Sequence, residues 1–247
     1  MARRERDACA PLKGSVSLIT GARSTIGAAT ARLLAAQGAR VALTAPPSAS
    51  ALLDALATQI EDAGGQCLII PADLGTRARA RTLVRRVIET WGRLDILVVT
   101  DSDDTTAGLP SDGASAPRHL GQPDPAMHGL LHATTAALPS MTRQGGGDIV
   151  VVAPVAGRVL RSGSGGLASA RIALEVAALC DTLRRQAGPR GVRVAVVEPD
   201  LVAGEGSADQ SASPDTEDVA DAILYVLTRP SRLSIAEVLI RPTDRRG

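Results

Sequence analysis

The chain has 247 residues, of which 45% are apolar and 21% are charged, a composition that fits one folded α/β domain and excludes a wholly disordered chain. The 27 lysines and arginines nearly balance the 26 aspartates and glutamates, so the charge predicts neither a nucleic-acid partner nor an anionic membrane surface. The start of the chain is charged, and no apolar run reaches the roughly 18 residues that a membrane span needs, so we expect a cytoplasmic protein.

Short β-branched runs alternate with longer helical patterns along the chain, which is typical of a parallel sheet with crossover helices. The predicted strands are 16–20, 40–44, 67–72, 96–100, 148–153, 192–197 and 237–241. The predicted helices are 26–37, 49–63, 76–91, 126–143, 167–186 and 217–227. This order predicts a single doubly wound Rossmann-type domain over residues 13–247, with a seven-stranded, mostly parallel sheet and helices on both faces. A flexible arm, 1–12, is expected before it.

Two connections are longer than usual, 101–125 and 203–214, and both are rich in glycine, proline, serine or acidic residues. Loops of this length are commonly functional or mobile. The cysteines Cys9, Cys67 and Cys180 are far apart and odd in number, which predicts neither a disulfide framework nor a metal site. His128 and His132 are four residues apart, but no third ligand is placed by any spacing, so we expect them on a helix surface or interface and predict no metal.

The first strand and helix are joined by the turn Thr20-Gly21-Ala22-Arg23-Ser24-Thr25-Ile26-Gly27. A glycine turn at this place lets backbone amides and a helix N-terminus face a pyrophosphate. The turn resembles the Thr-Gly-x-x-x-Gly-Ile-Gly motif of short-chain dehydrogenases/reductases. The resemblance implies cofactor contacts from Gly21, Arg23, Ser24, Ile26 and Gly27. Thr25 replaces the middle glycine of the motif, and its β-branched side chain is expected to obstruct the phosphates or to force a different backbone path.

At the other positions where the family contacts its cofactor, this sequence matches the family only in part. Asp73 and Leu74 match the family's adenine-binding pair, and Arg23 is placed to meet a 2′-phosphate. The end of the second strand, 45–47, offers neither an acid for ribose hydroxyls nor an arginine. We therefore favour NADP over NAD, with binding of no dinucleotide left open. The family's Asn-Asn-Ala-Gly after the fourth strand is replaced by 99–102, whose carboxylate on Asp101 repels a pyrophosphate if it points inward and is harmless if solvated.

The resemblance extends to the region where the family carries its catalytic Asn, Ser, Tyr and Lys. The stretch 168–175 resembles the helix that follows the family's tyrosine, which places Leu167 at the tyrosine position and Arg171 at the lysine position. Pro154 then stands in place of the serine, at the family's spacing, and Ala126 stands in place of the asparagine. Leucine, proline and alanine have no proton to give, and Arg171 could at most hold a ribose hydroxyl.

Two classes of function follow from these substitutions. In the preferred one, the protein is a catalytically silent family member that supports an intact reductase subunit or associates with itself through helices 126–143 and 163–187. In the other, it is a working enzyme of small-molecule biosynthesis with a rebuilt site. That enzyme would be an NADP-dependent ketoreductase, or a non-redox dehydratase, cyclase or isomerase that uses Asp101 and Asp200 with Glu198 and Arg171 as acid and base groups.

Overall fold

The computed structural model describes residues 10–100, 125–153, 166–199 and 214–241. The greater part of the expected arm, 1–9, and most of both long connections lie outside these residues. Leu12, which we expected in the arm, is buried in the core, and its amide donates to the carbonyl of Gln37. The packed part of the chain therefore begins no later than Leu12.

The sheet has seven strands in the order β3-β2-β1-β4-β5-β6-β7, and every strand pair within the described residues is parallel. The strands are β1 (Val16–Thr20), β2 (Arg40–Thr44), β3 (Gln66–Ile69), β4 (Ile96–Val99), β5 (Gly147–Val152), β6 (Val192–Pro199) and β7 (Glu237–Ile240). The strand order reverses between β1 and β4, and ligands bind at such a switch point, beyond the carboxyl ends of the strands. The predicted doubly wound, seven-stranded sheet is confirmed.

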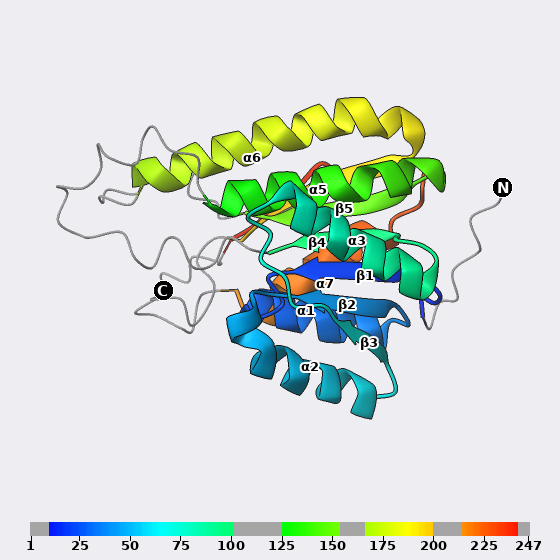
Figure 1. Cartoon of the computed structure of the whole chain (residues 1–247). Coiled ribbons are helices and arrows are strands. Elements are labelled where there is room, and N and C mark those ends of the chain that lie inside the picture. Colours follow the sequence, from blue (N-terminus) through cyan, green and yellow to red (C-terminus); the bar gives the residue numbers. More distant parts are fainter. Residues whose placement is uncertain (1–9, 101–124, 154–165, 200–213, 242–247) are drawn as a thin grey trace, which may run out of the picture.

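Helices cover both faces of the sheet (Figure 1). On one face lie α1 (Thr25–Ala36), α2 (Ser50–Asp62) and α7 (Thr216–Thr228). On the other face lie α3 (Arg77–Trp91), α5 (Pro125–Arg143) and α6 (Gly166–Ala187). Short 3₁₀ helices, η1 (Pro47–Ala49) and η3 (Gly188–Arg190), follow β2 and α6. None of the helices in the described ranges is long and apolar enough to cross a membrane.

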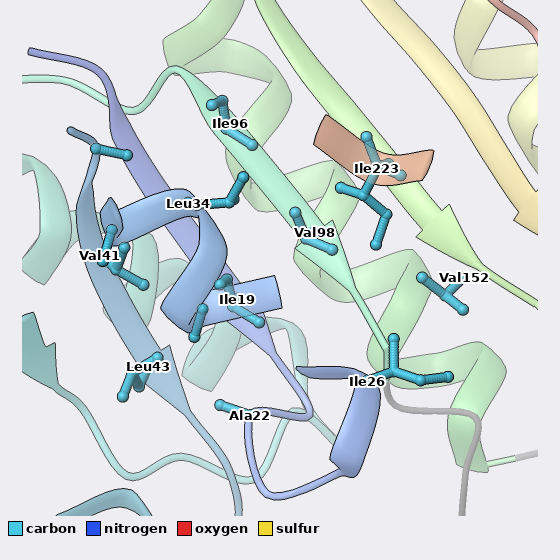
Figure 2. Packing of buried hydrophobic residues seen from close by; sticks show 14 of the residues in the cluster. Ile19, Ala22, Ile26, Leu34, Val41, Leu43, Ile96, Val98, Val152 and Ile223 are labelled. Carbon is cyan, nitrogen blue, oxygen red and sulfur yellow. The ribbon is translucent and has the colours of Figure 1, made fainter. Parts of the chain in front are cut away.

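Two hydrophobic cores result, because successive side chains of a strand point to opposite faces of the sheet. Ile19 and Val98 face α1 and α7, whereas Leu18 and Leu97 face α3 and α5. Figure 2 shows Ile26, from the first turn of α1, packed into the same core as Ile19, Val98 and Val152. This contact fixes the start of α1 above the carboxyl ends of the central strands, where the candidate site lies.

The chain after β3 continues along β2 beyond the end of the regular strand. The amides of Ile70 and Ala72 donate to the carbonyls of Leu43 and Ala45, although the regular strand ends at Ile69 and not at residue 72 as expected. Pro71 has no N–H, and a proline is tolerated on this edge of the sheet, where its missing donor faces no neighbouring strand. The parallel course carries the next residues to the carboxyl edge, beside the end of β2.

Candidate functional site

The turn after β1 has the backbone geometry of a phosphate cradle. Gly21 has a φ of +68°, a left-handed backbone conformation that is unfavourable for residues with a Cβ. Ser24 is the N-cap of α1, and its hydroxyl accepts a hydrogen bond of 3.0 Å from the amide of Gly27. A Cβ on Gly27 would lie 2.4 Å from the carbonyl oxygen of Gly21, so this position accepts only glycine without a shift of the backbone. The predicted glycines are thus required by the close approach of helix and turn.

Thr25, in place of the middle glycine, is the first residue of α1 and is exposed. No non-glycine residue in the described parts of the chain has a positive φ, so Thr25 needs no left-handed backbone conformation. Thr25 stands at the helix N-terminus, the end whose first amides can bind a pyrophosphate. Obstruction of the phosphates by its side chain stays a prediction.

The hydroxyl of Thr100 contacts the backbone of the turn after β1, and our sequence analysis missed this contact. Its hydroxyl donates to the carbonyl of Thr20 over 2.7 Å, lies 3.2 Å from that of Gly21, and is 3.4 Å from the hydroxyl of Ser24. A Cβ on Gly27 would also lie 2.9 Å from this hydroxyl. We had considered Thr100 only as part of a lost amide-rich turn. A hydroxyl residue at the end of the strand that pairs with β1 was the signal that could have identified it.

Asp73, the expected adenine contact, already has partners within the protein. One carboxylate oxygen accepts from the amide of Gly75 over 2.9 Å, and the other accepts from Arg79, on the first turn of α3, over 2.6 Å. The side chains of both Asp73 and Arg79 are more than half exposed. An open pocket of about 510 Å³ adjoins this pair. Its lining includes Pro47, Ile70, Asp73, Arg79, Thr82 and Leu83.

His132 fixes the neighbouring turn from α5. Its Nδ1 lies 2.9 Å from the carbonyl oxygen of Leu74, and the ring is half-buried. His132 therefore lies on the side of α5 that the turn after β3 contacts, which the sequence did not predict. His128 is exposed, and its ring stacks against that of His132 with the centroids 6.1 Å apart. Within the described ranges, no group of three or more potential ligands is arranged to hold a metal ion.

The four positions expected to have lost their catalytic side chains fall on or beside three elements. Leu167 and Arg171 are one turn apart near the start of α6, and Ala126 is the second residue of α5. Pro154 lies outside the described residues, just after β5, so its relation to the other three is not part of the structure.

Only some of the proposed acid and base groups lie within the described residues. Asp101 and Asp200 lie outside the described residues. Glu198 is buried near the carboxyl end of β6, where it pairs in register with Leu239 of β7. Tyr225, the only tyrosine of the chain, is on α7 and is 52% exposed, with the guanidinium of Arg229 4.1 Å from its ring centroid. Figure 1 shows α7 on the opposite face of the sheet from α5 and α6.

Residues 15–215 match the family model described as short chain dehydrogenase. The chain belongs to this family. Among relatives, an uncharacterized oxidoreductase of Staphylococcus saprophyticus is 30% identical over 241 residues, which cover 94% of this chain and 98% of that protein. The glycine betaine reductase ATRR of Emericella nidulans is 31% identical over 254 residues, which cover 95% of this chain but only 19% of that much longer protein.

Solved structures of this family share the fold. A metagenomic short-chain oxidoreductase in complex with NADP superposes with a TM-score of 0.74 at 29% identity, over 94% of this chain and 98% of that one. A short chain dehydrogenase from Mycobacterium smegmatis gives a TM-score of 0.73 at 25% identity, over 100% and 99% of the two chains. The predicted membership of the short-chain dehydrogenase/reductase family is thus confirmed.

The residues of the turn after β1 fit the pyrophosphate of a dinucleotide. The left-handed backbone at Gly21 and the space that a Cβ on Gly27 would fill make a cradle for a pyrophosphate, and the first amides of α1 face it. Thr25 adds at the start of α1 a side chain that the family motif lacks. The adenosine would extend across the end of β2 toward Leu74 and Asp73.

The two described cysteines lie away from this edge. Cys180 is fully buried in α6, and burial raises the pKa of its thiol to about 12. Cys67 is half-buried in β3, and burial, with a smaller effect of the nearby Glu61 carboxylate, raises the pKa of its thiol to about 11. Neither thiol is a nucleophile at neutral pH, because only the thiolate reacts.

Proposed function

We propose that this short-chain dehydrogenase binds NADP but does not carry out the ketone reduction of its family, and that it serves as a non-catalytic subunit in an oligomer. The family is one of oxidoreductases, and its relatives are named as such. The proposal is that this chain keeps the cofactor-binding turn of the family and lacks the family's catalytic side chains.

The turn after β1 supports the binding half of the proposal. Gly21, Ser24, Ile26 and Gly27 would hold the pyrophosphate through backbone amides, and Leu74 would border the adenine. A bound nicotinamide dinucleotide supplies or accepts a hydride. The exposed Arg23, within the same turn, adds a positive charge that suits the more anionic NADP.

The position of Tyr225 is the observation that best supports the proposed absence of ketone reduction. The resemblance places Leu167 where the family has its proton-donating tyrosine. A tyrosine elsewhere in the fold could take over that role only if it reached the same face of the sheet. Tyr225 lies on α7, behind the sheet as seen from α6, and its ring is stacked with Arg229. The general acid of the family, typically worth about 10²- to 10⁴-fold in rate, therefore has no tyrosine to replace it.

Exposed leucines on α5 and α6 support the oligomer. Leu131 of α5 is 44% exposed and Leu174 of α6 is 69% exposed, and the two helices pack side by side (Figure 1). Large apolar side chains that recur on one outer face are typical of association surfaces. A second copy or an intact reductase subunit that covers α5 and α6 would remove these leucines from water.

Glu198 favours a second candidate, a non-redox enzyme. A carboxylate buried at the carboxyl end of β6 stands at the edge where ligands bind in this fold, and buried carboxylates at such edges often act as acids or bases. Together with Asp200 and Asp101 it would supply proton transfers for a dehydration, cyclisation or isomerisation. A divergent NADP-dependent ketoreductase is the third reading, favoured by the oxidoreductase names of the relatives.

One set of measurements on the purified chain separates these functions. NADPH and NADH are titrated while nicotinamide fluorescence is followed, and NADPH oxidation is then assayed against a panel of small ketones. We expect saturable NADPH binding and no turnover above the background rate. Brisk ketone reduction would show a working reductase. No binding at millimolar cofactor would exclude the ketoreductase and contradict the proposed NADP binding.

Light scattering after size-exclusion chromatography tests the oligomer. We expect a species larger than the monomer, and Leu174→Glu should shift it toward the monomer. Leu52→Glu is the matched control, since Leu52 is about as exposed but lies on α2, on the other face of the sheet. A monomeric wild-type chain that also captures no purified family reductase would contradict the proposed role as a subunit.

A further inference from the structure

The carboxyl end of β2 lacks the side chains that distinguish the two nicotinamide cofactors. In this fold an acid at that point binds the ribose hydroxyls of NAD, and a nearby arginine accepts the 2′-phosphate of NADP. Here Thr44 and Ala45 are buried, and Pro46 and Pro47 follow. None of these four residues carries a charge, so a cation for the phosphate has to come from another element.

The pocket beside the end of β2 brings in such a cation. Pro47 and Arg79 line the same open pocket of about 510 Å³, although they come from the turn after β2 and from the first turn of α3. Arg79 is 32 residues further along the chain than Pro47, but the course of 70–72 along β2 brings the start of α3 to this edge. The guanidinium of Arg79 and the turn at the end of β2 thus border the same pocket.

The ion pair of Arg79 is one that an incoming phosphate can replace. Its Nη1 donates to Asp73 over 2.6 Å, and both side chains are more than half exposed. An exposed ion pair of this kind contributes little to stability, so it can be exchanged at small cost. Arginine carries five donors in a planar fork that matches a phosphate, and one bond to Asp73 leaves the others available.

We propose that Arg79 binds the 2′-phosphate of NADP from α3, in place of the missing cation at the end of β2 and in addition to the exposed Arg23 of the turn after β1. Asp73 is its counterion in the absence of cofactor and competes with the phosphate for the guanidinium. The inference rests on the proposed binding of a dinucleotide, and it names a further residue that determines the preference for NADP.

Two substitutions with opposite expected signs test the assignment. Arg79→Gln should weaken NADPH binding at least about tenfold and leave NADH binding within about twofold, because only NADPH carries the phosphate. Asp73→Asn should do the reverse and raise the preference for NADPH over NADH, since it removes the competing carboxylate. Any contact of Asp73 with adenine cancels in that ratio, because the adenine is common to both cofactors.

Arg86→Gln is the matched control, an exposed arginine on the same helix that is not part of the pocket lining. The readout is the dissociation constant from fluorescence titration, with a thermal melt to show that each variant is folded. An unchanged preference in Arg79→Gln, or an equal loss for both cofactors, overturns the assignment while the dinucleotide-binding function stands. If the wild-type chain binds neither cofactor, the proposed function and this inference both fail.

Discussion

Arg193 and Asp148 form a buried ion pair that joins β6 to β5 near their amino ends. The side chains are 11% and 6% exposed, and Nε of Arg193 donates to Oδ1 of Asp148 over 2.5 Å. The remaining donors of the guanidinium reach the carbonyls of Leu227, Arg229 and Leu233, which follow one another through the end of α7 and the turn beyond it. One arginine thus fastens α7 and the approach to β7 onto the sheet.

Breaking this pair should destabilise the whole domain. Asp148→Asn leaves the Arg193 charge buried without its carboxylate, so we expect the free energy of unfolding to fall by about 3 kcal/mol or more. Urea denaturation followed by circular dichroism measures the change. Arg93→Gln, which removes the half-exposed partner of Asp95, is the comparison and should cost about 1 kcal/mol or less. Equal costs for the two variants would contradict the special role of the buried pair.

Gly27→Ala should damage both stability and cofactor binding. The new Cβ would lie 2.4 Å from the carbonyl oxygen of Gly21, and the shift that relieves this contact costs about 1–3 kcal/mol. Gly188→Ala is the control, since a Cβ there meets nothing within 4 Å. Thermal melts and NADPH titrations of the two variants give the comparison. Full NADPH affinity in Gly27→Ala would show that the turn after β1 is not the phosphate cradle.

Thr25→Gly restores the middle glycine of the family motif. Because Thr25 is exposed and has no special backbone conformation, we expect a loss of only about 0.5 kcal/mol in stability from the lower helix propensity of glycine. Without this side chain at the start of α1, the phosphates of NADPH should meet no steric clash there. Because such a clash costs ~1 kcal/mol, we expect NADPH to bind about threefold or more tightly. Unchanged affinity with unchanged stability would mean that the threonine does not limit the cradle.

Restoring the four family side chains should restore reduction. The variant carries Ala126→Asn, Pro154→Ser, Leu167→Tyr and Arg171→Lys, and we expect ketone-dependent NADPH oxidation about 10²-fold or more above the wild type. The control keeps Leu167 and carries the other three changes, and it should stay near background because it has no proton donor. Activity in the control equal to that of the full variant would refute the assignment of Leu167 to the tyrosine position.

Cys180 gives the protein a defined loss of stability at alkaline pH. Its thiol keeps its proton in the folded state up to a pKa of about 12, whereas the unfolded thiol releases it near 9.0. Above pH 9 the unfolded state therefore binds fewer protons, and the free energy of unfolding falls as the pH rises, by at most about 1.4 kcal/mol per pH unit for this group. Below pH 9 the contribution is fully present.

Urea denaturation of the wild type and of Cys180→Ala between pH 7.5 and 10.5 isolates this effect, with those pH values chosen to lie about 1.5 units either side of the ordinary thiol pKa. Other titrating groups are common to both proteins and cancel in the difference. The stability advantage of the wild type should shrink as the pH rises above 9. A difference that is constant over the series would show that the thiol titrates at an ordinary pKa.

The strands were predictable because each is a compact apolar run that ends at glycine, proline or a charged residue. Their pairing was predictable because alternating strands and helices leave few topologies. The partner of Arg193 was not predictable, since Asp148 is 45 residues away and meets it only through the register of β5 and β6. The contact between His132 and the carbonyl of Leu74 has the same origin, as it joins α5 to a turn 58 residues earlier.

The site was predictable only where a local motif fixes the backbone. Gly21, Ser24 and Gly27 lie as the turn motif indicates, because glycine conformation and helix capping are local properties. The contacts of Thr100 with the turn and of Arg79 with Asp73 were missed, because they depend on which strand ends are neighbours at the carboxyl edge. The effect of Thr25 on the phosphates stays a prediction, since the structure shows only that threonine begins α1 without a positive φ.

The Arg193 ion pair separates the stability of this domain from its candidate site. The pair lies near the amino ends of β5 and β6, at the rim opposite to the carboxyl ends of the strands, so substitutions at the candidate site leave this anchor untouched. For the same reason the domain is a suitable scaffold for engineering. New activities can be introduced by substitutions at the carboxyl ends of the strands, while the ion pair at the amino ends maintains the stability of the fold.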